Sequence, residues 1–236
     1  FSKNKIGVMQ GRLLHKYKNR FQAHPVGYWQ EEFPLAQKLG LDCIEFILDL
    51  NDINFNPLMS KDGLGEIKNL INQTNIGIDT ICADYLMECP LHCKDELIAE
   101  QAQKILLRLL KASVELGVTD IVIPCVDQSS IKGIDERKNL VKRIKEIKPI
   151  LEELKINLAL ETDLDPYSFV ELIDSIDSNF IKVNYDIGNS ASLGFDINQE
   201  LNAYGEIISD IHIKDRLLGG NSVFLGEGDA NFDQFF

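Results

Sequence analysis

Short runs of apolar, often β-branched residues alternate along this chain with longer stretches in which apolar residues recur every three or four positions. The short runs have the length of buried strands, and the longer stretches have the spacing of amphipathic helices. The short runs predict strands at residues 5–9, 42–48, 76–83, 119–126, 156–161, 181–186 and 208–214. The longer stretches predict helices at residues 29–40, 63–74, 95–117, 135–154, 166–176 and 199–204.

This alternation predicts a parallel sheet, because parallel strands are joined by crossovers of helix length. An open doubly wound sheet and a closed barrel both fit. No G-x-G-x-x-G motif follows the first run, and polar residues collect after nearly every strand, which favours the barrel. We therefore predict an α/β fold of the TIM-type (β/α) barrel, as a single domain over residues 1–236. Seven strands are visible, and we expect the eighth to be missing from the C-terminus, because the sequence stops as a helix begins.

Three of the predicted strands end in a side chain that can bind a metal. Glu161, Asp186 and His212 are separated by 186 − 161 = 25 and 212 − 186 = 26 residues. In a barrel of this type the carboxyl ends of all strands surround one site. Two carboxylates and an imidazole suit Mn²⁺, Mg²⁺, Co²⁺ or Zn²⁺, so we predict one divalent metal. Each residue alone could equally be an ordinary polar group at a strand end.

Further polar residues near strand ends are candidates for substrate binding. Arg12 suits a phosphate or carboxylate group, although a surface ion pair is an equal interpretation. Glu45 could instead be a buried, hydrogen-bonded residue of the barrel, and Lys214 a solvated loop charge. The predicted substrate-binding residues are Gln10, Arg12, Glu45, Asp84, Asn189, Lys214, Arg216 and Glu227.

Charge and cysteine content narrow the class of partner. The net charge of −13 disfavours nucleic acid, and no apolar run is long enough to span a membrane. The chain has five cysteines, and we expect reduced thiols in a cytoplasmic protein. Cys89, His92 and Cys93 are too closely spaced for a structural zinc site and lack a second pair. A homo-oligomer is compatible with the sequence.

Motifs along the whole chain point to a family. They include VMQGRL (8–13), IEFILD (44–49), LALETD (158–163), NYDIGNS (184–190), HIKDR (212–216) and LGEGDANF (225–232). With these motifs the chain resembles the xylose isomerase-like barrel superfamily, in particular its sugar phosphate isomerase/epimerase branch. The resemblance implies that Glu161, Asp186 and His212 bind a divalent metal and that Glu161 is also a catalytic base. A glutamate on the eighth strand, expected beyond Phe236, would be the fourth ligand.

The resemblance also implies a reaction: isomerisation or epimerisation of a sugar, sugar phosphate or related polyol. A proton would move at a carbon next to a carbonyl, through an enediolate that the metal stabilises. A dehydratase or lyase on the same scaffold, a non-catalytic sugar-binding barrel and an endonuclease IV-like phosphodiesterase are the alternatives. The last is disfavoured, because the chain has only four histidines and a strong negative charge.

Two positions depart from the family pattern. Many members carry a histidine where Asn189 stands, and asparagine can bind a hydroxyl group but cannot donate a proton near neutral pH. This weakens the match to the ketose 3-epimerase group. Glu227 lies in a glycine-rich loop, where we expect it to line the site or bind substrate rather than to serve as the last ligand.

Overall fold

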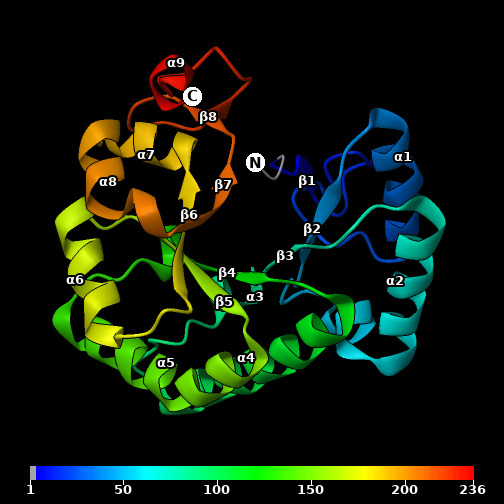
Figure 1. Cartoon of the computed structure of the whole chain (residues 1–236), viewed down its shortest axis with the longest axis horizontal. Coiled ribbons are helices and arrows are strands. Elements are labelled where there is room, and N and C mark those ends of the chain that lie inside the picture. Colours follow the sequence, from blue (N-terminus) through cyan, green and yellow to red (C-terminus); the bar gives the residue numbers. More distant parts are fainter. Residues whose placement is uncertain (1–3) are drawn as a thin grey trace.

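The computed structural model describes residues 4–236 and confirms the predicted parallel architecture. Seven strands form one sheet in sequence order, each pairing in parallel with the next, and the sheet curls with helices on its outer side (Figure 1). Sequence order across the sheet is typical of a barrel and differs from the reordered strands of a doubly wound sheet. The strands are β1 (Gly7–Met9), β2 (Cys43–Ile47), β3 (Thr80–Cys82), β4 (Asp120–Cys125), β5 (Asn157–Thr162), β6 (Ile181–Asp186) and β7 (Ile208–His212).

The helices begin and end where local chemistry favours it. The carboxylate of Asp95 accepts hydrogen bonds from the Leu97 and Ile98 N–H groups at the start of the longest predicted amphipathic helix, and Gly117 ends that helix at φ 76°. The helices are α1 (Glu32–Leu39), α2 (Lys61–Thr74), α3 (Tyr85–Glu88), α4 (Glu96–Leu116), α5 (Ile134–Leu154), α6 (Pro166–Ile176), α7 (Ile187–Leu193), α8 (Ile197–Tyr204) and α9 (Phe232–Phe235).

The core has two apolar layers. A small cluster of Ile47, Cys82, Val122 and Ala159 forms one of them. The larger layer includes Phe33, which is fully buried. A search of residues 4–236 for a helix that could cross a bilayer finds none.

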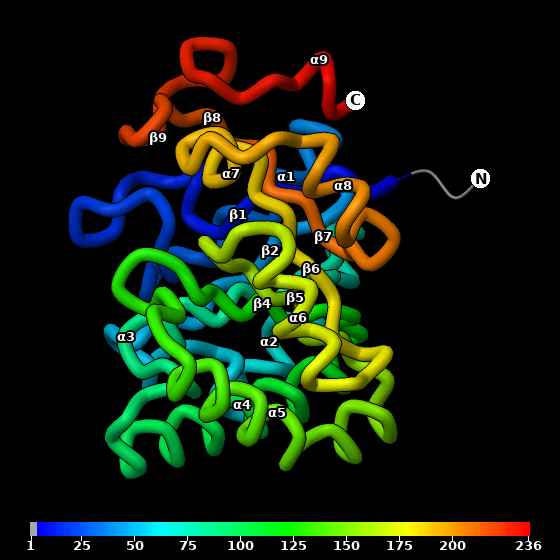
Figure 2. The backbone as a smooth tube through the Cα atoms, turned by 90° about the vertical axis from the view of Figure 1, so that its left-hand side faces the viewer, coloured from blue at the N-terminus to red at the C-terminus, as the bar shows by residue number. Residues whose placement is uncertain are grey.

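The structure differs from the sequence prediction mainly at the C-terminal end. The last predicted strand stops at His212, and the following residues form a hairpin of β8 (Asp215–Arg216) and β9 (Ser222–Val223). Helix α7 was not predicted, because it follows β6 without any loop: Asp186 is both the last residue of the strand and the N-cap of the helix. Figure 2 shows the hairpin next to α7, with α9 beyond it at the top of the view.

One glycine permits this close packing. A Cβ atom on Gly188, in the first turn of α7, would lie 2.8 Å from the carbonyl oxygen of Lys214. Glycine at this position therefore lets α7 approach the chain that leaves β7.

Candidate metal and catalytic site

Glu161, Asp186 and His212 come together at the carboxyl ends of β5, β6 and β7. The parallel register sets Asp186 beside His212. Nδ1 of His212 lies 3.9 Å from Oε2 of Glu161 and 4.0 Å from Oδ2 of Asp186. Around a divalent ion with bonds of about 2.1 Å, neighbouring ligand atoms lie about 3–4 Å apart. The three atoms are therefore spaced as a metal site requires.

Hydrogen-bond donors gather at the atoms that face this centre. The amide nitrogen of Asn184, on β6, lies 3.1 Å from Oε2 of Glu161 and 3.0 Å from Nδ1 of His212. The ammonium group of Lys214 lies 2.8 Å from Oδ2 of Asp186. Two carboxylates and an imidazole grouped in this way form a donor set that fits a divalent cation.

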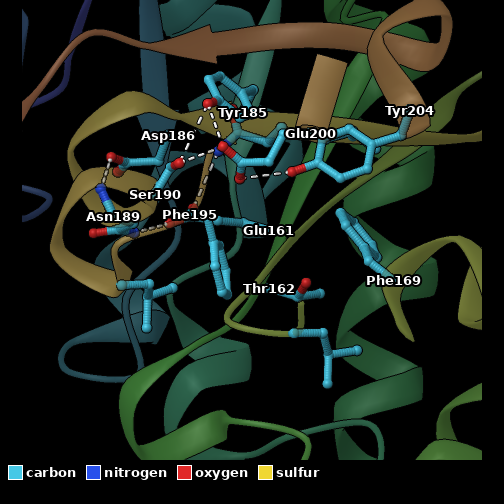
Figure 3. A pocket seen from close by; sticks show the side chains of 14 residues that line it. Glu161, Thr162, Phe169, Tyr185, Asp186, Asn189, Ser190, Phe195, Glu200 and Tyr204 are labelled. Carbon is cyan, nitrogen blue, oxygen red and sulfur yellow. Dashed lines mark hydrogen bonds between the residues drawn. The ribbon is translucent and has the colours of Figure 1, made fainter. Parts of the chain in front are cut away.

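The other oxygen of each carboxylate is held by Asn189. Its side-chain NH₂ donates to Oε1 of Glu161 at 2.5 Å, and its backbone N–H donates to Oδ1 of Asp186 at 2.8 Å. Figure 3 shows Asn189 between these two carboxylates. The guanidinium group of Arg216 donates to the side-chain oxygen of Asn189 at 2.8 Å.

The electrostatic environment shifts the pKa values of Glu161 and His212. Burial and the Asp186 carboxylate raise the pKa of Glu161 above its ordinary value, although His212 and Lys214 act in the opposite direction. Burial alone would lower the pKa of His212, but the carboxylates of Glu45, Glu161 and Asp210 raise it to about 10.

Glu45 reaches His212 from the opposite side of the imidazole. Its Oε2 lies 2.9 Å from Nε2 of His212, and Oδ2 of Asp210 lies 3.8 Å from the same nitrogen. Glu45 is buried in β2. Glu45 is therefore buried and hydrogen-bonded, with His212 as the partner, and its role in substrate binding stays a prediction.

The remaining candidate residues have other hydrogen-bond partners or are exposed. Gln10 is fully buried and accepts a hydrogen bond from the Ile47 N–H. Arg12 is exposed, and its guanidinium group donates to the side-chain oxygen of Gln22 at 3.4 Å. Asp84 accepts hydrogen bonds from Cys82 and Gln22, and burial raises its pKa to about 6. Glu227 is exposed in the loop after β9.

Two parts of the site were missed by sequence reasoning. Asn184 is two residues before Asp186, so both point to the same face of β6; a polar residue inside the apolar run was the available signal. Glu200, on α8, is buried and accepts hydrogen bonds from Tyr185, Ser190 and Tyr204 at 2.7, 2.5 and 2.8 Å. Figure 3 shows these groups lining a pocket beside Glu161 and Asp186. No motif in the sequence indicates that Glu200 belongs to the site.

The expected reduced thiols agree with the structure, in which all five cysteines are free. Within residues 4–236, two groups of three side chains are arranged so that they could hold a metal. One is Glu161, Asp186 and His212, and the other is Glu45, Asp210 and His212. Cys89, His92 and Cys93 belong to neither.

Comparison with known proteins places the chain in a family. A family model described as xylose isomerase-like TIM barrel matches residues 33–236. The chain is 25% identical over 227 residues to L-ribulose-5-phosphate 3-epimerase UlaE of Escherichia coli (strain SMS-3-5 / SECEC), covering 91% of this chain and 79% of that protein.

Solved structures agree in fold. The IOLI protein with a binding zinc atom matches with a TM-score of 0.76 at 18% identity, covering 98% of this chain and 83% of that one. D-psicose 3-epimerase in the presence of D-fructose matches with a TM-score of 0.69 at 16% identity, covering 89% and 72%. The protein therefore belongs to the xylose isomerase-like TIM barrel family, as its motifs predict.

Proposed function

We propose that this protein is a divalent-metal-dependent epimerase or isomerase of a ketose or ketose phosphate. The observation that carries the proposal is the convergence of Glu161, Asp186 and His212 at the carboxyl ends of three neighbouring strands, where enzymes of this fold place their active sites. The names of the similar proteins, L-ribulose-5-phosphate 3-epimerase and D-psicose 3-epimerase, support this substrate class.

Glu161, Asp186 and His212 are the residues that would hold the cation. When bound, a divalent cation polarises the carbonyl group of a substrate and so acidifies the neighbouring C–H. Lys214, whose ammonium group lies at this same centre, is the candidate partner for an anionic substrate group.

Glu161 is the proposed base. A C–H group next to a carbonyl is a weak acid, so its removal needs a positioned group whose pKa lies near the working pH. Burial and the Asp186 carboxylate raise the pKa of Glu161, whereas a bound cation would lower it. The carboxylate form of Glu161 would take the proton, and the resulting carboxyl group would return it.

Deuterium incorporation tests the proposal. The full-length protein with Mn²⁺ is incubated in D₂O with a panel of ketoses, ketose phosphates and aldoses, and proton NMR follows the carbons next to the carbonyl. We expect exchange at one carbon of at least one sugar, and its loss after chelation. Glu161→Gln should slow exchange about 1,000-fold, whereas Glu153→Gln, at an exposed position on α5, should leave it unchanged.

Two results would overturn the proposal. One is the absence of exchange across the whole panel with metal present. The other is a product that has lost water, which would favour the dehydratase alternative.

A further inference from the structure

Asn189 forms hydrogen bonds with both carboxylates of the candidate metal site. It contacts Glu161 through its side chain and Asp186 through its backbone, and in each case it holds the oxygen that faces away from His212. The two remaining oxygens, Oε2 and Oδ2, are those within about 4 Å of Nδ1 of His212. Asn189 therefore holds, in both carboxylates, the oxygen that does not face the candidate metal centre.

The orientation of the Asn189 amide is fixed by Arg216. A guanidinium group only donates hydrogen bonds, so the atom of Asn189 that lies 2.8 Å from Nη1 of Arg216 must be its oxygen. The NH₂ group then points to Glu161. The reverse orientation would place the amide oxygen against the Glu161 carboxylate and the NH₂ group against the Arg216 guanidinium group.

Arg216 is itself held by the hairpin that follows β7. Its Nε and Nη2 both donate to the carbonyl oxygen of Gly220, at 3.1 and 2.9 Å. A continuous chain of hydrogen bonds thus runs from the β8–β9 turn through Arg216 and Asn189 to Glu161.

We propose that Asn189, oriented by Arg216, is a positioning residue that makes Glu161 and Asp186 each bind the cation through one oxygen. The inference rests on the metal site of the proposed function. A carboxylate free to rotate can bind through both oxygens or turn away, whereas a held carboxylate presents one lone pair in a fixed direction. In this arrangement the side-chain oxygen and NH₂ group of Asn189 are both engaged, so it acts on the ligands rather than on substrate.

Metal affinity tests the inference without any assay of turnover. Mn²⁺ binding is measured by calorimetry, and the visible spectrum of the Co²⁺-loaded protein reports changes in coordination. We expect Asn189→Ala to weaken Mn²⁺ binding about 10–100-fold, the usual effect of losing a partner that orients a ligand. Asn189→Asp, which sets a carboxylate against Glu161, should weaken it further. Arg108→Met, at an exposed position on α4, is the matched control for arginine loss.

A double substitution separates positioning from substrate contact. If Arg216 acts through Asn189, Arg216→Met weakens Mn²⁺ binding on its own but adds nothing to Asn189→Ala. Circular dichroism and thermal melting check that each variant is folded.

The outcomes distinguish a failure of the positioning role from a failure of the metal site. If the wild-type protein binds Mn²⁺ and folded Asn189 and Arg216 variants bind it equally well, the positioning role is wrong while the metal site stands. An Arg216→Met variant with unchanged Mn²⁺ affinity and a raised KM would show direct substrate contact and would also overturn it. If the wild-type protein binds no divalent cation, the metal-dependent function fails first.

Discussion

Two histidines in this protein, His24, which is buried, and His212, which is half-buried, have opposite electrostatic environments. His212 lies among Glu45, Asp210 and Glu161, which raise its pKa to about 10. His24 lies against the rings of Trp29 and Phe46, at centroid distances of 5.9 and 5.5 Å, and burial lowers its pKa to about 4. Burial by itself disfavours a charged imidazole, so the neighbours decide whether the ring is charged.

The hydrogen bonds around His24 also assign its neutral form. The oxygen of the Gln10 side chain accepts the Ile47 N–H, which fixes the orientation of that amide. Nδ1 of His24 lies 3.2 Å from the same oxygen and must therefore carry its proton. Its Nε2 is buried and has no hydrogen-bond partner within the part of the chain that the structure describes. His24 is therefore a histidine packed against aromatic rings, whereas His212 is surrounded by potential metal ligands.

The largest expected effect is on stability at low pH. Between the two pKa values the folded protein binds fewer protons at His24 than the unfolded chain does, so this contribution is complete above about pH 6.5 and is lost as the pH falls. Lowering the pKa from 6.5 to about 4, at about 1.4 kcal/mol per pKa unit, should reduce the free energy of unfolding by about 3 kcal/mol between about pH 7.5 and about pH 4.

Urea unfolding at several pH values measures this contribution. His24→Gln keeps a donor for the Gln10 oxygen but does not titrate, so its stability should fall less steeply over the same range. Identical pH slopes for the two proteins would mean that His24 is not the neutral, buried group described above.

A second effect concerns metal binding and should appear at one histidine only. His212→Ala removes a proposed ligand, and we expect Mn²⁺ affinity to fall about 100-fold or more, beyond the effect of losing an orienting partner. His24→Ala should leave the affinity of the folded protein unchanged. Mn²⁺ affinity is measured by calorimetry. An equal loss of affinity in both variants would show that His212 is no more a metal ligand than His24 is.

The smallest effect concerns how β6, α7 and α8 are held together. Glu200 accepts hydrogen bonds from Tyr185 on β6, Ser190 on α7 and Tyr204 on α8. Glu200→Gln preserves the shape but weakens these bonds, and we expect a loss of about 1–2 kcal/mol in the free energy of unfolding. Glu206→Gln, at an exposed position nearby, serves as the control in the same urea titration. A loss no greater than that of the control would show that the buried hydroxyl groups contribute nothing measurable.

The fold was largely predictable because its signals are local. Alternating strand and helix patterns predicted seven strands, and the helices predicted at residues 29–40 and 95–117 end within one residue of the ends that the structure shows. Helix α7 was missed because its start coincides with the end of β6, which leaves no loop signal. The convergence of Glu161, Asp186 and His212 followed from their equal positions on successive strands.

The remaining contacts could not be predicted, because they join residues far apart in the sequence. Glu45 and His212 are 167 residues apart, and nothing in either motif indicates that one faces the other. The same holds for Arg216 and Asn189, whose contact depends on how the β8–β9 turn folds. The cytoplasmic location, the absence of a nucleic-acid partner and the oligomeric state stay predictions.

The missing side chain of Gly188 has a consequence for how this protein can vary. The barrier to a Cβ atom there comes from the backbone of Lys214, 2.8 Å away, which no change of side chain elsewhere can remove. At Gly65, on α2, a Cβ atom would meet nothing within 4 Å, so that position is free to mutate. The segment from Asp186 to Asn189 therefore packs backbone against backbone on the segment from His212 to Arg216, and any side chain at position 188 would push apart the two segments that carry Asp186 and His212.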